Sequence, residues 1–218
     1  MVKALLLDMD GLLIDSEKYS YQVYVDYLKE RGIVFSLEFY IKKMCGSKAI
    51  DNVKTIIKEF NLDVDLNETV EDIVERERKY FNAGIPLKKG ALELFDYCKH
   101  NNIKLILSTS SLKDRAMIAI NHNNIDHYFD DKVFGIDVKH GKPAPDLFLK
   151  ACEKAKCNKE ECIVLEDAEK GIESAYNGGI PVICVPDIKP PKQEYIDKCI
   201  KVCDSLLDVI DYIKTVNN

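Results

Sequence analysis

Two aspartates, one residue apart, follow an apolar run close to the start of the chain. Asp8 and Asp10 come directly after three leucines, and Gly11 follows them. Residues i and i+2 of a strand lie on the same side, so both carboxylates begin on one face where the strand ends. Carboxylates this close repel each other, which costs stability unless a bound cation offsets the repulsion or the pair serves phosphate chemistry. The glycine allows a sharp turn or a close backbone approach. The stretch indicates a reactive site, with a simple polar turn as the alternative.

Further polar groups occur later in the chain, each after an expected strand or in a loop beside one. They are Thr109 and Ser110, then Lys142, then Glu166 and Asp167. Carboxylate oxygens are hard ligands that suit Mg²⁺, whereas a lysine, hydroxyl groups and backbone N–H groups suit phosphoryl oxygens. Each group alone is equally well explained as a polar turn, a surface turn or a helix cap. Together, in this order, they indicate a phosphoryl-transfer centre.

The elements that must position these groups follow from the hydrophobic pattern. Expected strands lie at residues 5–7, 104–107, 133–134, 162–165 and 181–185, with helices between the later ones. Strands that alternate with helices predict an α/β fold with a doubly wound parallel sheet. Such sheets bind ligands beyond the carboxyl ends of their strands, at a switch in strand order. The polar groups above follow strands at that end of the sheet.

A long helical segment separates the first expected strand from the others. Apolar residues recur at helical spacing from residue 16 to residue 83, including the charged run at residues 75–78, which we interpret as a solvated helix face. The pattern predicts two domains. Residues 16–83 form an all-helical insert, and residues 1–15 and 84–218 form the core.

Composition narrows the class of protein. The chain has 218 residues, 46% of them hydrophobic, and a net charge of −6. This balance argues against a nucleic-acid-binding or membrane-binding surface, although a metal ion or a local lysine can still attract an anionic substrate. No signal peptide or membrane-spanning run is visible, and the eight cysteines include no C-x-x-C pair. We expect a cytoplasmic monomer with reduced thiols.

The four groups, in this order, resemble the motifs of the haloacid dehalogenase-like phosphatases. The motifs are Asp8-Met9-Asp10-Gly11, Leu107-Ser108-Thr109-Ser110-Ser111, Gly141-Lys142-Pro143 and Leu165-Glu166-Asp167-Ala168. The resemblance covers nearly the whole chain. It extends to the subgroup with a small helical cap after the first strand, which includes pseudouridine-5′-phosphatase, glycerol-3-phosphatase and β-phosphoglucomutase. It implies a core with a Rossmann-like sheet and a cap formed by the insert.

The resemblance implies four catalytic residues and, beside them, one substrate-binding residue, Ser110. Asp8 would attack phosphorus and form an aspartyl-phosphate. Asp10 would protonate the leaving oxygen and later deprotonate the hydrolytic water. Thr109 and the N–H group of Ser110 would bind phosphoryl oxygens, and Lys142 would neutralise the nucleophile and the phosphoryl group. Because a dehalogenase lacks an acid two residues after its nucleophile, Asp10 argues against that chemistry.

The resemblance also implies a magnesium ion as cofactor. Its ligands would be the carboxylate of Asp8, the main-chain carbonyl of Asp10 and Asp167, with Glu166 in or near the coordination shell. The ion would screen the repulsion between nucleophile and phosphate.

Three further residues are candidate substrate contacts. Gly11 lies in the first motif, and Gly46 and Lys48 lie in a loop that breaks two helices of the insert and carries a cation. A cap that closes over the site would bring that loop to the substrate. An ordinary solvated surface lysine explains Lys48 equally well.

The substrate class follows from the same resemblance. Mutases of the β-phosphoglucomutase type typically carry a histidine past the first motif and a lysine and an arginine around the cap loop. Here Ser20, Cys45 and Ala49 stand at those places. We therefore predict a phosphatase for a small phosphorylated sugar, polyol or nucleoside monophosphate. The alternative is a mutase that interconverts β-glucose 1-phosphate and glucose 6-phosphate. A non-catalytic binding protein is disfavoured because both aspartates of the first motif are present.

Overall fold

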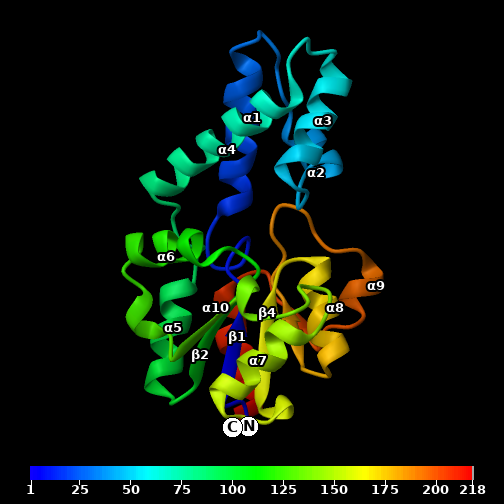
Figure 1. The fold of residues 1–218 in the computed structure, drawn as a ribbon. Coiled ribbons are helices and arrows are strands. Elements are labelled where there is room, and N and C mark those ends of the chain that lie inside the picture. The colour runs from blue at the N-terminus through cyan, green and yellow to red at the C-terminus, as the bar shows by residue number, and fades with distance from the viewer. Residues whose placement is uncertain (218) are drawn as a thin grey trace. The chain divides into compact units, whose positions relative to one another are not determined.

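A computed structural model describes residues 1–217 of the chain. The chain divides into two compact units (Figure 1). The first consists of Met1–Asp15 and Pro86–Asn218, and the second of Ser16–Ile85. The second unit thus ends two residues after the helical insert expected from the sequence.

A parallel sheet forms the centre of the first unit. Its strands are β1 (Ala4–Leu7), β2 (Lys104–Thr109), β3 (Asp131–Phe134), β4 (Cys162–Glu166), β5 (Val182–Cys184) and β6 (Lys201–Val202). In the described residues the strand order is β3-β2-β1-β4-β5-β6, and every neighbouring pair is parallel. The predicted doubly wound α/β fold is therefore confirmed.

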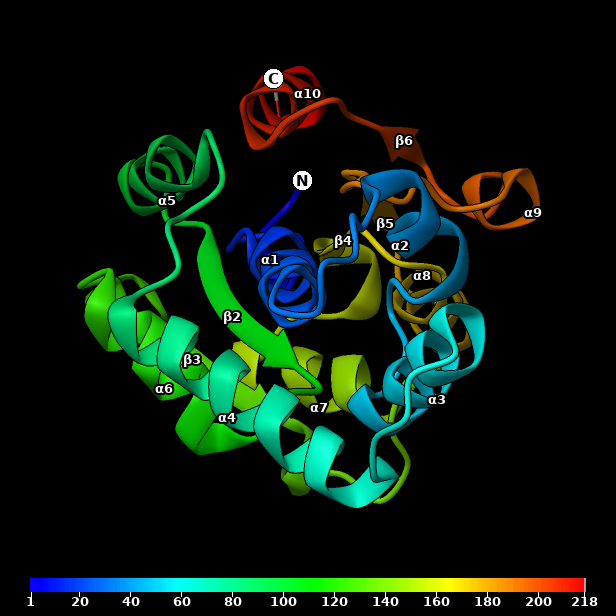
Figure 2. The ribbon, with the colours of Figure 1, turned by 90° about the horizontal axis from the view of Figure 1, so that it is seen from above.

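Helices cover the sheet. They are α5 (Ala91–His100), α6 (Lys113–His122), α7 (Asp146–Ala155), α8 (Glu169–Gly178), α9 (Gln193–Ile196) and α10 (Leu206–Asn217). Seen from above, α5 and α10 lie on one side of the sheet, and α7 and α8 lie on the other (Figure 2). Every residue of β1 is buried, because apolar layers cover both of its faces. Short 3₁₀ turns at Asp126–Tyr128, Gly135–Asp137 and Lys159–Glu161 complete the connections.

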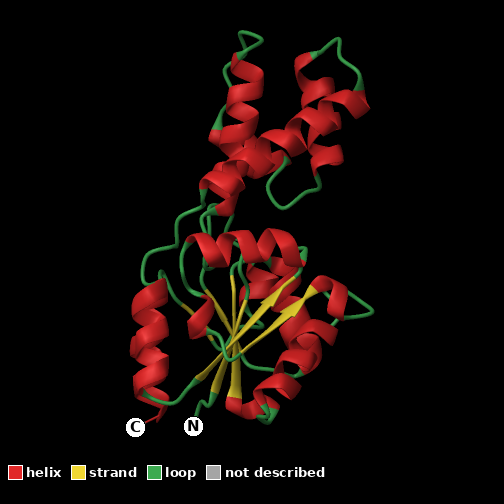
Figure 3. Cartoon of the chain, turned by 60° about the vertical axis from the view of Figure 1, so that its left-hand side comes forward, coloured by secondary structure: helices red, strands yellow, loops and turns green. Residues whose placement is uncertain are grey.

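The second unit is built from helices, and the strands of Figure 3 belong to the first. Its helices are α1 (Ser16–Lys29), α2 (Leu37–Lys43), α3 (Ala49–Phe60) and α4 (Leu66–Ala83). Helix α4 packs against both α1 and α3. Ser36 caps α2 and Asp65 caps α4, each through a side-chain oxygen that accepts a backbone N–H. The buried rings of Tyr24, Tyr27 and Tyr40 fill much of its core.

The structure extends two strands beyond their expected ends. Thr109 is the last residue of β2 because it pairs with Phe134 of β3, and Glu166 is the last residue of β4 because it pairs with Cys184 of β5. Both residues had been expected in the loops after these strands. Strand β6 and helix α9 were not predicted, since each is too short to show a hydrophobic period.

Two further expectations concern the chain as a whole. All eight cysteines are free, and six of them are buried. Among the helices of residues 1–217, none is long and apolar enough to cross a membrane.

Candidate active site

The candidate site lies where the carboxyl ends of three neighbouring strands meet. Leu7, the last residue of β1, pairs with Leu107 of β2 on one side and with Leu165 of β4 on the other. Asp8 follows directly, and its backbone N–H donates to the carbonyl of Leu165 at 3.2 Å. The chain order reverses at β1, since β2 and β3 lie to one side and β4 to β6 to the other. Open α/β sheets bind ligands at such a switch point.

A tight turn after Asp8 depends on Gly11. This residue has φ +81°, a left-handed backbone conformation that side chains strongly disfavour. A Cβ atom there would lie 2.3 Å from Oδ2 of Asp167. The glycine is thus needed both for the turn and for the close approach of the backbone to Asp167, the residue after β4. Its contact with substrate stays a prediction.

Lys142 reaches the end of the sheet from the loop before α7. Its Nζ atom contacts Oδ1 of Asp8 and donates to Oε1 of Glu166 at 2.6 Å. The lysine side chain is only 8% exposed. Burial alone would lower the pKa of Lys142, but the charges of the two carboxylates outweigh it and raise the pKa. The group is therefore a permanent buried cation beside the expected nucleophile.

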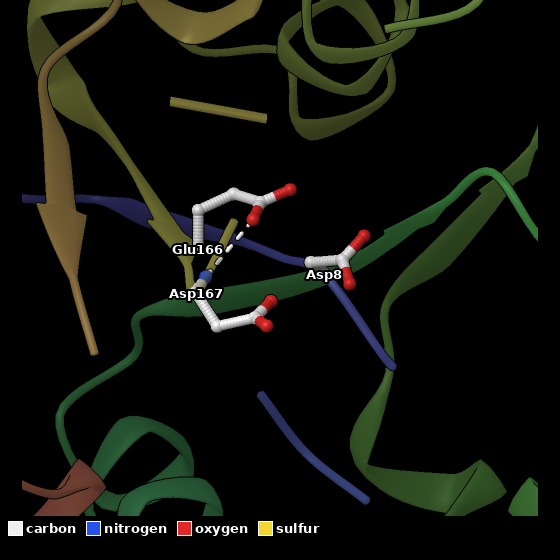
Figure 4. A group of neighbouring side chains, drawn as sticks. All are labelled: Asp8, Glu166 and Asp167. Carbon is white, nitrogen blue, oxygen red and sulfur yellow. Dashed lines mark hydrogen bonds between the residues drawn. The ribbon is translucent and has the colours of Figure 1, made fainter. Parts of the chain in front are cut away.

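Three acids gather around that lysine. One carboxylate oxygen from each of Asp8, Glu166 and Asp167 lies within 4.8 Å of the others (Figure 4). All three residues are buried. The second oxygen of Glu166 accepts the backbone N–H groups of Asp167 and Ala168, each at 2.9 Å, which fixes the orientation of its carboxylate.

Burial, together with repulsion between the acids, disfavours the ionised carboxylates of this cluster. Burial raises the pKa of Asp8 to about 7, with help from the charges of Glu166 and Asp10 and against the attraction of Lys142. Burial, followed by the charges of Glu166 and Asp8, raises the pKa of Asp167 well above its usual value. A bound cation would relieve this repulsion.

The donor set fits a hard divalent cation. Oδ1 of Asp167 is buried and has no hydrogen-bond partner among residues 1–217, so it has an unused lone pair at the cluster. Carboxylate oxygens from two strand ends are the ligands that Mg²⁺ takes in proteins, together with substrate phosphate. The structure brings Asp8, Glu166 and Asp167 together, while their role as metal ligands and the identity of the metal stay predictions.

The side chain of Asp10 contacts residues at and just before the start of α6. Its Oδ2 atom accepts the hydroxyl of Ser111 at 2.6 Å and Nη1 of Arg115 at 2.8 Å. The role of its main-chain carbonyl as a metal ligand stays a prediction. Sequence reasoning missed Arg115. The one available signal was its position in the first turn of α6, shortly after Ser111 of the second motif.

The structure places Thr109 and Ser110 at the carboxyl end of β2, beside β1. Thr109 is buried, and its hydroxyl oxygen accepts the backbone N–H of Ser111 at 3.0 Å. The carbonyl of Ser110 packs so closely on Gly135 that a Cβ there would lie 2.7 Å from it. Phosphoryl binding by this pair stays a prediction.

Gly46 and Lys48 belong to the second unit. Both are exposed, Gly46 has φ +77°, and Lys48 is the N-cap residue of α3. Their proposed contact with substrate stays a prediction.

The first unit contains another charge pair, which sequence reasoning did not identify as part of the site. Nζ of Lys88 contacts Oδ1 of Asp187, whose side chain is only 5% exposed. Asp187 follows β5, the neighbour of β4, and its charge is one of those that raise the pKa of Asp167.

Comparisons with known proteins agree with this geometry. The family model described as "Haloacid dehalogenase-like hydrolase" matches residues 5–185. The (DL)-glycerol-3-phosphatase 1 of Arabidopsis thaliana is 31% identical over 93% of this chain and 70% of its own. The phosphorylated carbohydrates phosphatase of Thermotoga maritima is 26% identical over 82% of each chain.

Solved structures share the fold. A β-phosphoglucomutase from Clostridium difficile superposes with a TM-score of 0.71 and 24% identity, over 99% of this chain and 96% of its own. The chain belongs to the haloacid dehalogenase-like hydrolase family, as its four motifs indicated.

Proposed function

We propose that the chain is a Mg²⁺-dependent phosphatase that hydrolyses a small sugar or polyol phosphate through an aspartyl-phosphate. The observation that carries the proposal is the buried Lys142, in contact with Asp8 and Glu166 beside the under-satisfied Asp167. The two phosphatases above support the substrate class, because their names give phosphorylated carbohydrates and glycerol 3-phosphate as substrates.

The first half-reaction transfers the phosphoryl group to the protein. A carboxylate oxygen of Asp8 attacks phosphorus, so a bond from that oxygen to phosphorus forms while the ester bond breaks. The leaving alkoxide takes a proton from Asp10 and departs as an alcohol. Lys142 neutralises negative charge next to the attacking oxygen, since its ammonium already contacts Asp8.

The second half-reaction hydrolyses the aspartyl-phosphate and regenerates the free carboxylate of Asp8. Asp10, now ionised, takes a proton from a water molecule, and the resulting hydroxide attacks phosphorus. The bond to Asp8 breaks, and inorganic phosphate leaves. Ser111 and Arg115 hold the carboxylate of Asp10 through two hydrogen bonds, which gives the acid–base group a fixed place between the two steps.

Asp8, Asp167 and the main-chain carbonyl of Asp10 would hold the metal ion, with Glu166 in or near its shell. When bound, Mg²⁺ supplies positive charge that stabilises the developing charge on the phosphoryl oxygens.

Metal-dependent release of inorganic phosphate tests the proposal. The substrates are a panel of sugar, polyol and nucleoside monophosphates, assayed with Mg²⁺ and with EDTA. We expect release from sugar or polyol phosphates, lost in EDTA and in Asp8→Asn. Glu173→Gln is a matched control. It removes the charge of an acid on α8 that pairs with Lys198 and takes no part in the candidate site. Release that persists in Asp8→Asn would contradict the mechanism.

The mutase alternative has a distinct outcome in the same experiment. If a bisphosphate primer is added, a β-phosphoglucomutase converts β-glucose 1-phosphate to glucose 6-phosphate without net release of phosphate. That result, with no release from any other ester, would overturn the phosphatase proposal.

A further inference from the structure

The charge pair of Lys88 and Asp187 joins two segments that border the candidate site. Lys88 lies just after the second unit, and its backbone N–H donates to the carbonyl of Leu13 at 2.8 Å. Leu87 forms a bridge with Ile14 of the turn that follows Asp8. The segment that carries Lys88 is therefore attached to the turn of the first motif.

Asp187 approaches the site from the opposite side, along β5. The backbone N–H of Val185 donates to the carbonyl of Glu166 at 2.8 Å, so the loop after β5 begins next to the end of β4. Asp167 starts the loop after β4, and the charge of Asp187 contributes to its raised pKa. The two acids thus occupy adjacent loops at the same edge of the sheet.

The ion pair with Lys88 satisfies only one of the two carboxylate oxygens of Asp187. One carboxylate oxygen contacts Lys88, but Oδ2 is buried and finds no hydrogen-bond partner within the described chain. Burying an unsatisfied polar atom costs free energy, so such an atom requires an explanation. Oδ1 of Asp167, on the neighbouring loop, is in the same condition. Two carboxylates with unused oxygens therefore border the place where the donor set fits a divalent cation.

We propose that Asp187 is a positioning residue for the divalent cation: its negative charge, held in place by Lys88, strengthens binding of the ion by Asp8, Glu166 and Asp167. The inference rests on the cation site of the proposed function. Groups outside the immediate ligands of a metal commonly control its affinity by about 10-fold to 100-fold. Lys88 has the opposite electrostatic effect, because a positive charge near the site disfavours a second cation.

Substitutions of Asp187 and of Lys88 should therefore change the affinity for Mg²⁺ in opposite directions. Asp187→Asn keeps the shape and removes the negative charge, so it weakens Mg²⁺ binding. Lys88→Met removes the positive charge and keeps the carboxylate of Asp187, so it strengthens Mg²⁺ binding while it destabilises the metal-free protein. A pair that merely holds two loops together would give loss of affinity in both variants.

Isothermal titration calorimetry of the full-length metal-free chain with MgCl₂ measures this directly, without reliance on activity. We expect the dissociation constant to rise about 10-fold to 100-fold in Asp187→Asn, to fall in Lys88→Met and to stay unchanged in the control Glu173→Gln. Circular dichroism of each metal-free variant establishes that it is folded.

The outcomes separate this inference from the proposed function. If the unmodified chain binds no Mg²⁺, both fail. If it binds Mg²⁺ and Asp187→Asn binds equally well, or if Lys88→Met weakens binding, only the positioning role fails. Should Asp187→Asn not fold, Lys88→Met still decides, because only an electrostatic role predicts tighter binding.

Discussion

Replacement of the expected nucleophile should stabilise the metal-free protein in a pH-dependent way. Asp8 is buried beside Glu166 and Asp10, and these surroundings raise its pKa to about 7 despite the contact with Lys142. The ionised form is therefore disfavoured in the folded chain relative to the unfolded chain. Asp8→Asn cannot ionise, so it escapes this cost while losing activity.

The sign and size follow from proton linkage. The pKa of Asp8 is about 7 in the folded chain and 3.8 in its usual state. Between these values the folded chain binds more protons than the unfolded chain, so its free energy of unfolding falls as the pH rises. One pH unit corresponds to about 1.4 kcal/mol, which gives a loss of roughly 4 kcal/mol between about pH 4 and pH 7. Above the folded-state pKa the loss levels off.

Guanidinium unfolding in EDTA, from about pH 5 to pH 8, measures the effect. We expect the stability of Asp8→Asn relative to the unmodified chain to rise by roughly 2–3 kcal/mol over this range. Asp131→Asn is a control that should show no such trend: a hydrogen bond from Lys154 lowers the pKa of that acid below its usual 3.8, so it is ionised in both the folded and the unfolded chain across this range. A difference between Asp8→Asn and the unmodified chain that does not change with pH would refute the reasoning.

Three further substitutions test single contacts. Gly11→Ala brings a Cβ to 2.3 Å from Oδ2 of Asp167, so we expect phosphate release to fall by about 100-fold, as for a misplaced reacting group. Lys142→Met leaves two buried carboxylates without their cation, and urea unfolding of the metal-free protein should show a loss of about 3–5 kcal/mol. Arg115→Met removes a hydrogen bond that the carboxylate of Asp10 accepts. Steady-state kinetics should show kcat reduced about 10-fold with KM little changed, as expected when an interaction acts only in the transition state.

Two control substitutions lie elsewhere in the chain. Gly32→Ala also places a side chain at positive φ, +72°, but nothing lies within 4 Å of the added atom, so activity should survive. Lys198→Met removes a lysine that pairs with Glu173, away from the candidate site, and should leave kinetics unchanged. Full activity in Gly11→Ala, parental stability in Lys142→Met or parental kcat in Arg115→Met would each contradict the corresponding contact.

Much of the fold could be predicted because it depends on local patterns. Apolar runs of strand length alternate with amphipathic helices, and this alternation alone indicates a parallel sheet. The ends of strands depend instead on their neighbours. Thr109 and Glu166 belong to strands because Phe134 and Cys184 pair with them, and no local signal in the sequence reports that pairing. Strand β6 consists of two exposed residues, which form a strand through β5 and not through any hydrophobic period.

Part of the candidate site could likewise be predicted from local motifs, and part of it could not. Asp8, Lys142, Glu166 and Asp167 lie in recognisable motifs, and the structure brings them together. The direction of a side chain is not contained in a motif. The contact of Asp10 with Ser111 and Arg115 depends on how α6 begins relative to β1.

The pairing of Lys88 with Asp187 joins residues that no motif connects. Such contacts need the three-dimensional arrangement, since 99 residues separate the two partners.

The central place of β1 in the sheet has a consequence for the order in which the protein is made. Ala4 pairs with Lys104 on one side and Cys162 on the other, and Lys142 lies 134 residues after Asp8. During synthesis one edge of the first strand stays uncovered until half of the chain has been made, and the other stays uncovered until β4 follows. Contacts this distant in sequence form slowly. The second unit, which is one continuous segment, Ser16–Ile85, can fold while the rest of the chain still emerges from the ribosome. Catalytic competence is therefore a late product of translation.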